Sequence, residues 1–236
     1  ARSRDRPLAK EIRYCQWSKS SGSSLKGCSD RKLLMPDLKM EQELIRSGMD
    51  PVAGIDEAGR GPLAGPVTAA AVILPCGYEH ALLDDSKKLT ARSRDLIYEE
   101  LTSDPSICWG VAFAEVEEID ALNILRATHT AMRRAAMALS ARPSFCLIDG
   151  LDVPGFPLDA RGVVKGDGIS LSIAAASIIA KVSRDRRMQE LAEEFPVYGF
   201  EKHKGYGTKA HLEALREHGP CPEHRRSFAP VAELAG

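Results

Sequence analysis

The chain has 236 residues, 44% of them hydrophobic, which is enough for one domain with a substantial core and a tail. Its 32 Lys and Arg residues nearly balance its 33 Asp and Glu residues, so any basic surface for nucleic acid must be local. No apolar run approaches the ~20 residues of a membrane span, and the charged N-terminal residues contain no hydrophobic stretch like that of a signal peptide. The six cysteines form no C-x-x-C pair. We therefore expect a cytoplasmic protein without membrane contact.

The first 34 residues differ in composition from the rest of the chain. They contain the run SKSSGSS and several Lys and Arg residues, without a sustained apolar period. A segment of this composition buries too little apolar surface to offset its loss of conformational entropy. We therefore predict that residues 1–34 are a disordered extension and that the folded domain occupies residues 49–236.

From Met49 onward, short apolar runs alternate with segments of helical periodicity. The apolar runs, bounded by Gly, Pro or acidic residues, predict strands at 52–55, 66–74, 108–113 and 145–148. Apolar residues spaced by three and four, or a capping residue such as Thr90, predict helices at 91–101, 124–139, 172–195 and 210–218. This order favours an α/β fold in which helices flank a mixed sheet.

Four acidic residues follow predicted strands. Asp56 and Glu57 come directly after the first strand, Asp149 ends a later apolar strand, and Asp167 follows a further apolar run. Any one of them could be an ordinary exposed loop residue, because charged side chains usually lie at the surface. Together at strand ends, where catalytic groups gather, they predict a carboxylate cluster. Such clusters bind hard divalent cations, and a pair of ions suits cleavage of a phosphodiester.

A glycine-rich segment, Gly59–Gly65, directly follows the first acidic pair. Glycine lets the backbone approach a phosphate or another backbone closely. A dinucleotide-binding loop would need the spacing G-x-G-x-x-G, which this segment lacks, and Asp56 and Glu57 would repel a pyrophosphate. The chain contains no G-x-x-x-x-G-K-[ST] sequence either, so nothing favours nucleoside-triphosphate chemistry.

The segment Gly54–Val67, GIDEAGRGPLAGPV, resembles the signature of the ribonuclease HII family. Six further blocks resemble segments of that family, in the same order along the chain. They are Asp85–Leu89, Leu147–Gly150, Lys165–Asp167, Ala174–Val182, His203–Tyr206 and His224–Phe228. The resemblance covers Val52–Val231, and its seven ordered blocks argue against coincidence.

This resemblance implies a ribonuclease H-like fold with a C-terminal helical extension. It implies an endonuclease that hydrolyses the RNA strand of RNA–DNA hybrids and cuts 5′ of single ribonucleotides in duplex DNA, leaving 3′-hydroxyl and 5′-phosphate ends. Asp56, Glu57, Asp149 and Asp167 would then be its catalytic, metal-binding carboxylates, holding two Mg²⁺ or Mn²⁺ ions. Its partners would be RNA–DNA hybrid and ribonucleotide-containing DNA, in ribonucleotide removal and repair, and we expect a monomer.

The resemblance also indicates candidate substrate-binding residues. In the family, the residues matching Gly59, Arg60 and Gly61 surround the ribose 2′-hydroxyl through backbone groups, whereas a tight turn between strands is the structural alternative. Tyr206 could stack on a sugar or base, or pack a helix on the sheet, and the resemblance favours substrate contact. The candidate phosphate contacts are Ser86, Lys87, Lys88, Arg225 and Arg226, although charged runs are more often solvated faces.

Several alternatives stay open at this point. Asp185 could join the metal cluster or pair with Lys181 or Arg186, and we favour the pairing. The histidines and cysteine at 218–224 could suggest zinc, but they lack the usual paired ligand spacing. A ribonuclease H of the third type would carry an extra N-terminal domain, which residues 1–34 are too short and polar to form. A non-catalytic hybrid binder would lack one of the four acids, and all four are present.

Overall fold

The computed structural model describes residues 35–80, 83 and 89–234. Within these residues one sheet has the strand order β3-β2-β1-β4-β5. Its strands are β1 (Val52–Ala58), β2 (Val67–Ile73), β3 (Cys108–Ala114), β4 (Phe145–Asp149) and β5 (Ala160–Val163). β1, β2 and β3 pair antiparallel, whereas β4 runs parallel to β1 and β5 parallel to β4. The predicted mixed sheet is therefore confirmed.

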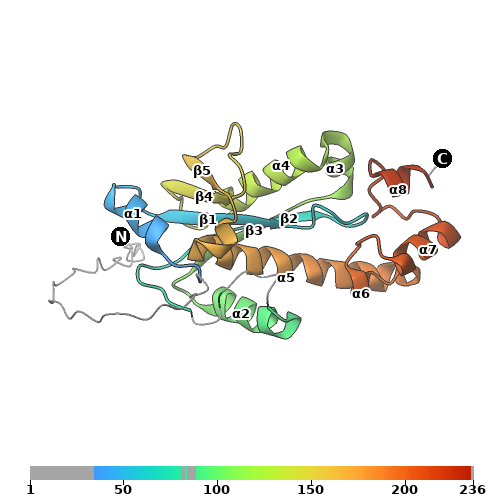
Figure 1. Cartoon of the computed structure of the whole chain (residues 1–236), viewed down its shortest axis with the longest axis horizontal. Helices are drawn as coiled ribbons and strands as arrows, with labels where there is room; N and C mark the ends of the chain where they lie inside the picture. The colour runs from blue at the N-terminus through green and yellow to red at the C-terminus, as the bar shows by residue number, and fades with distance from the viewer. Residues whose placement is uncertain (1–34, 81–82, 84–88, 235–236) are drawn as a thin grey trace, which may run out of the picture. The chain divides into compact units, whose positions relative to one another are not determined.

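Helices cover both faces of this sheet (Figure 1). On one face lies α4 (Ile124–Met137), next to α3 (Val116–Leu122). On the other face lie α5 (Leu171–Glu194) and α2 (Ala91–Ser103). As predicted, Thr90 caps α2, and its side chain accepts a hydrogen bond from the Ser93 N–H at 3.1 Å.

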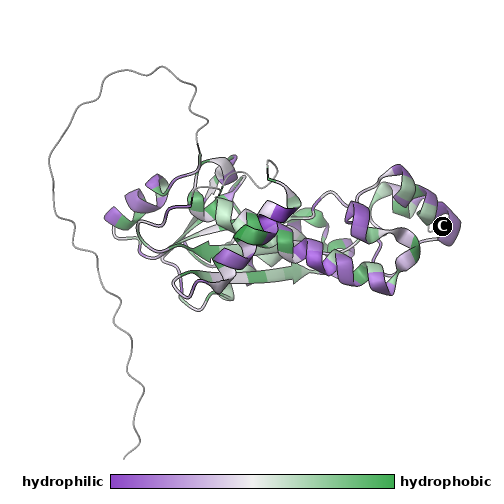
Figure 2. Ribbon diagram, turned by 90° about the horizontal axis from the view of Figure 1, so that it is seen from below, coloured by the Kyte–Doolittle hydropathy of each residue, from purple (hydrophilic) through white to green (hydrophobic). Residues whose placement is uncertain are grey.

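Each face of the sheet has its own apolar core. β2 places Ala69 in the core beneath α4 and Ala70 in the core beneath α5, because successive strand side chains point to opposite faces. A Cβ on Gly54 of β1 would lie 2.2 Å from the backbone of Ser172, so glycine lets α5 lie directly against β1. Figure 2 shows this apolar interior in green, with hydrophilic residues prominent on the helices around it.

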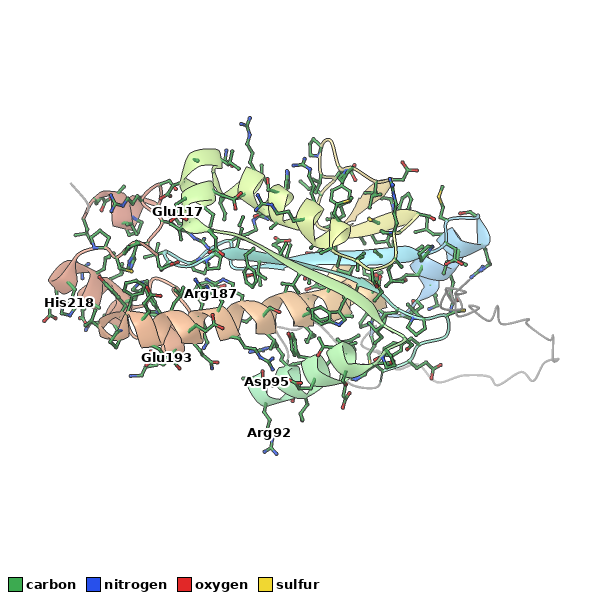
Figure 3. All side chains as sticks on the ribbon, turned by 180° about the vertical axis from the view of Figure 1, so that it is seen from behind. Arg92, Asp95, Glu117, Arg187, Glu193 and His218 are labelled. Carbon is green, nitrogen blue, oxygen red and sulfur yellow. The ribbon has the colours of Figure 1, made fainter. Side chains whose placement is uncertain are left out.

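Further helices precede and follow the sheet along the chain. α1 (Lys39–Arg46) precedes β1. The predicted C-terminal helical extension is confirmed and consists of η2 (Pro196–Tyr198), α6 (Phe200–His203), α7 (Lys209–His218) and α8 (Ala229–Ala232). Arg92 on α2 and His218 on α7 point outward from the protein surface (Figure 3). Across the described part of the chain, no helix combines the length and apolarity needed to span a membrane.

Helix α1 lies before residue 49, where we predicted the folded domain to begin, yet it is tied to α5. Glu41 is only 4% exposed. Its Oε1 accepts hydrogen bonds from the Ser170 and Ser172 hydroxyls, each at 2.5 Å, and from the Ser172 N–H at 3.1 Å. Asp37 forms a backbone bridge with Ser170. The segment 35–47 therefore packs as part of the same compact unit.

The first strand is longer than predicted, because it continues through the acidic pair. Asp56 pairs with Ala70 and Glu57 with Ala69 across the antiparallel ladder with β2. The ladder with β4 stops earlier, at Ile55. The two acids therefore lie within β1 but beyond its pairing with β4, where one edge of the strand is open.

Candidate active site

The two central parallel strands bring Asp56 and Asp149 together. Their last paired residues are Ile55 and Ile148, so each aspartate comes one position later, and both point to the same face of the sheet. This face carries α5, since Gly54, two residues before Asp56, contacts that helix. Neighbouring strands lie ~4.8 Å apart, which places the two carboxyl groups side by side.

Glu57 joins them although it follows Asp56 directly. In a continuous sheet, its side chain would point to the opposite face. β4 ends at Asp149, however, and the chain turns at Gly150 with a φ of +89°, which leaves room beside β1. The Glu57 carboxylate, with a side chain 13% exposed, contacts Nη1 of Arg60 at 3.3 Å.

Asp167 lies next to Asp149 through its backbone. It belongs to η1 (Gly166–Gly168), a short helical turn between β5 and α5, and is 5% exposed. Oδ1 of Asp149 accepts hydrogen bonds from the Gly166 N–H at 2.6 Å and the Asp167 N–H at 3.4 Å. The η1 backbone thus fixes Asp149. Within the ranges that the structure describes, no three His, Cys, Asp or Glu side chains already form a metal site.

Burial and mutual repulsion dominate the electrostatics of the acids. The pKa of Asp56 lies well above its ordinary value because of burial and because of the charges of Glu57 and Asp149. Hydrogen bonds from Ser177 and from the Glu57 N–H, the latter at 2.7 Å, oppose this rise only in part. Burial also raises the pKa of Glu57, against the lowering effect of Arg60. Buried carboxylates that repel one another favour a shared cation.

The acids open onto a cavity of about 300 Å³. Its remaining walls are glycine-rich, basic or aromatic and comprise Ala58, Gly59, Arg60, Gly61, Arg94, Ser177, Lys181, Arg184 and Tyr206. Nζ of Lys181 pairs with Oδ1 of Asp185 at 2.7 Å, which confirms the pairing favoured for this fifth acid. The cavity is therefore lined by negatively charged carboxylates together with positively charged and aromatic side chains.

Arg225 requires a correction, because we predicted it to contact a phosphate. Its side chain is fully buried and donates hydrogen bonds to the carbonyl oxygens of Gly59 (2.6 Å), Arg60 (3.0 Å) and Gly65 (2.8 and 2.9 Å). Burial lowers its pKa to about 9, so it stays charged at neutral pH. Arg225 thus stabilises the conformation of the glycine-rich segment through its carbonyl oxygens and does not face solvent.

A second buried arginine, Arg184, holds the same segment from α5. It donates to the carbonyl oxygens of Ala64 (3.2 Å) and Pro66 (3.0 Å), and to that of Lys204 (3.1 Å). Sequence reasoning missed this role. The signal was its spacing, since Arg184 lies four residues from both Ala180 and Met188, on the buried stripe of the helix. For Arg225, in an irregular segment, no comparable periodicity exists.

Tyr206 lies across from the glycine-rich segment. Its ring carbon Cε1 is 3.6 Å from the position that a Cβ on Gly61 would take, and the residue is 47% exposed. The Leu63 N–H donates to the Gly205 carbonyl at 2.8 Å, which fastens the two loops together. The structure therefore brings Gly59, Gly61 and Tyr206 to one cavity, while Ser86, Lys87 and Lys88 lie outside the described residues.

Sequence comparison identifies the family. The model of the family described as Ribonuclease HII matches residues 53–231, most of the chain. The chain belongs to the ribonuclease HII family. Ribonuclease HII of Chlamydia caviae is 51% identical over 205 residues, which cover 87% of this chain and 96% of that one. Ribonuclease HII of Delftia acidovorans is 56% identical over 183 residues, covering 78% and 77%.

Solved structures of ribonuclease HII relatives share the fold. Ribonuclease H2 from Pyrococcus horikoshii superposes with a TM-score of 0.65 at 25% identity, covering 78% of this chain and 96% of that one. RNase HII from Archaeoglobus fulgidus, solved in complex with PCNA, gives a TM-score of 0.63 at 28% identity, covering 75% and 95%. As a member of this family, the chain is an endoribonuclease with ribonuclease H activity on RNA–DNA hybrids, and enzymes of this class use divalent metal ions.

Proposed function

We propose that the chain cuts the RNA strand of hybrids and also the 5′ side of a single ribonucleotide embedded in duplex DNA, as in ribonucleotide removal. Water adds to the phosphorus and the bond to the 3′ oxygen breaks, which leaves 3′-hydroxyl and 5′-phosphate ends. The observation that carries the proposal is the meeting of Asp56, Glu57 and Asp149 in one cavity with the segment Gly59–Gly61. All of these residues come from one chain, and we propose that a monomer acts.

The acidic residues fit two divalent cations, Mg²⁺ or Mn²⁺. The donor set is entirely carboxylate oxygen, which these hard ions prefer. The raised pKa of Asp56 reflects repulsion from Glu57 and Asp149 that a shared cation would relieve. Asp167, whose N–H already contacts Asp149, would complete the set. When bound, the ions would stabilise the negative charge that develops on the phosphate.

The glycine-rich segment offers donors for a ribose hydroxyl. Arg225 draws the carbonyl oxygens of Gly59 and Arg60 toward itself. Because the peptide bond is planar and trans, the N–H groups of Arg60 and Gly61 then point the opposite way. Both residues line the cavity, and these N–H groups could donate to the 2′-oxygen that distinguishes RNA from DNA.

Tyr206 and two cations complete the proposed substrate surface. The half-exposed ring of Tyr206, beside Gly61, is suited to stack on the sugar or base at the junction between RNA and DNA. Arg94 and Lys181, on the walls of the cavity, are suited to hold flanking phosphates.

The test is cleavage of three duplexes by the purified chain: an RNA–DNA hybrid, DNA with one ribonucleotide, and DNA alone. We expect cleavage of the first two with Mg²⁺ or Mn²⁺, none with a chelator, and a 5′-phosphate on the ribonucleotide. Asp149→Asn should remove both activities, whereas the exposed control Glu117→Gln on α3 should keep them. A folded Asp149→Asn protein with near-normal cleavage would overturn the assignment of the acids.

A further inference from the structure

Three histidines of the C-terminal region, His203, His211 and His224, form a cluster next to the Tyr206 backbone. His211 and His224 are fully buried, and their Nε2 atoms lie 3.0 Å apart. The ring of His203 stacks on that of His211, with centroids 4.4 Å apart. None of these side chains lines the cavity of the acids among the residues that the structure describes. Their arrangement therefore needs an explanation other than catalysis.

The hydrogen bonds fix which nitrogen of each ring carries the proton. Nδ1 of His211 lies 2.9 Å from the Tyr206 carbonyl, which can only accept, so Nδ1 carries the hydrogen and Nε2 accepts. The Cys221 N–H donates to Nδ1 of His224 at 3.0 Å, so the hydrogen of His224 is on Nε2. His224 Nε2–H must then donate to His211 Nε2. The bonds run in one direction, from Cys221 to Tyr206.

This chain of bonds ends on the backbone that carries the Tyr206 ring. The carbonyl of Tyr206 also accepts from the Thr208 N–H at 2.8 Å, where α7 begins. On the other side, the Gly205 N–H donates to Nδ1 of His203 at 3.3 Å. The histidines therefore set the path of the turn from residue 203 to 208, and with it the position of the ring beside Gly61.

His211 and His224 stay neutral at neutral pH. Burial lowers the pKa of His211, and burial together with His211 lowers that of His224 to about 4. The titratable groups packed against the pair are His203 on α6, Tyr198 on η2, with its ring centroid 4.8 Å from that of His224, and the Cys221 thiol. A proton added to His211 at Nε2 would face the N–H of His224, which disfavours the charged form.

We propose that His211 and His224 are positioning residues, whose directed hydrogen bonds hold Tyr206 against the glycine-rich segment and thereby set the preference for a single embedded ribonucleotide. This inference rests on the proposed role of Tyr206 at the RNA–DNA junction. A long hybrid offers contacts along its RNA strand, whereas a single ribonucleotide depends on the junction alone. We call the hydrogen bonds that run from Cys221 through His224 and His211 to Tyr206 the histidine relay. Loss of this relay should therefore reduce cleavage of the single-ribonucleotide duplex more than cleavage of the long hybrid.

The experiment compares His211→Asn, whose side-chain amide can replace the Nδ1 donor, with His211→Leu, which keeps bulk but has no donor. We expect His211→Leu to raise KM for the single-ribonucleotide duplex by roughly three- to tenfold, the worth of one hydrogen bond, with little change in kcat or on the hybrid. His211→Asn should recover most of this loss. Equal behaviour of the two variants, or parallel losses on both substrates, would overturn the relay.

Tyr206→Ala separates failure of the relay from failure of the proposed function. If this variant does not alter the ratio of kcat/KM on the two substrates, the role of Tyr206 fails, and the relay with it. If it alters the ratio but His211→Leu does not, only the relay fails. Nitrogen NMR of the wild-type imidazoles tests the geometry without any variant. We expect hydrogen on Nδ1 of His211 and Nε2 of His224, and the reverse pattern would overturn the proposal.

Discussion

Asp56 and Asp149 lie side by side because each stands one residue beyond the last pair, Ile55 and Ile148, of two parallel strands. The same register that aligns the apolar strands thus places two like charges on one buried face. The pKa of Asp56 is raised well above its ordinary value of 3.8, by burial first and then by Glu57 and Asp149. The site therefore costs the fold stability when no cation is bound.

Asp56→Asn should stabilise the ion-free protein while it removes activity. A carboxyl whose pKa is raised by folding destabilises the fold as pH rises from 3.8 through the folded pKa, and the neutral amide lacks this penalty. We expect a higher melting temperature at pH 7 without divalent ions, and a loss of activity of about 10³-fold or more. Mg²⁺ should raise the melting temperature of the wild type more than that of the variant.

The matched control is again Glu117→Gln, since Glu117 is exposed on α3. Its melting temperature and its response to Mg²⁺ should follow those of the wild type. If the Asp56→Asn protein melts at a lower temperature than the wild type without divalent ions, the negative charge of Asp56 does not destabilise the fold.

Arg225→Met should unfold the glycine-rich segment. The variant leaves the carbonyl oxygens of Gly59, Arg60 and Gly65 without their buried donor, at a cost of roughly 3 kcal/mol or more in unfolding free energy. Arg226→Met is the control, since that side chain is exposed one residue later. A phosphate contact would behave differently. Arg225→Met would then leave the melting temperature unchanged and lower the slope of binding against salt by about 1.

The apolar strands and the acids that follow them could be predicted because both are local patterns. Asp56 and Asp149 each end a short apolar run, and in neighbouring parallel strands such ends must meet. The continuation of β1 through Glu57 could not be predicted, since it depends on β2 pairing further than β4. Asp167 was placed at a strand end, but it lies in η1, whose N–H groups are held by Asp149 from another strand.

The buried charged residues that support the site could not be predicted from the local sequence pattern either. Lys, Arg and Glu are ordinarily exposed, so a buried arginine or glutamate is understood only once its acceptors or donors are known. Glu41 is such a case, because its partners, Ser170 and Ser172, lie far along the chain. The prediction of Tyr206 as a substrate contact came from the resemblance, since its surroundings alone left packing equally open.

His224 should make stability depend on pH in the acidic range. Its pKa falls from 6.5 in the unfolded chain to about 4 in the fold, mainly through burial. Between these values the unfolded chain binds the proton that the fold rejects, so stability is lost as pH falls from 6.5 toward 4. The melting temperature of His224→Gln should decline less over this range than that of the wild type. Parallel declines would show that His224 does not contribute.

Two shortened chains should separate the N-terminal extension from α1. A chain that starts at Met35 should keep the melting temperature and specific activity of the whole chain, because residues 1–34 lack an apolar period. A chain that starts at Met49 loses Glu41 and Asp37, and with them the hydrogen bonds that α1 makes to the start of α5. We expect it to lose roughly 2 kcal/mol or more of unfolding free energy, since two or more buried bonds disappear.

Activity of the Met49 chain should fall as well. Glu41 accepts a hydrogen bond from Ser170, and Ser170 lies two residues after η1, the turn that contains Asp167. Loss of Glu41 should therefore disturb the position of Asp167. Glu41→Gln and Glu41→Ala in the whole chain are the matched pair. Glutamine keeps an oxygen that can accept from Ser170 and Ser172, whereas alanine removes it, so only alanine should reproduce part of the Met49 loss. Unchanged melting and activity in the Met49 chain would mean that α1 does not support the site, and η1 would have to be held by β5 and α5 alone.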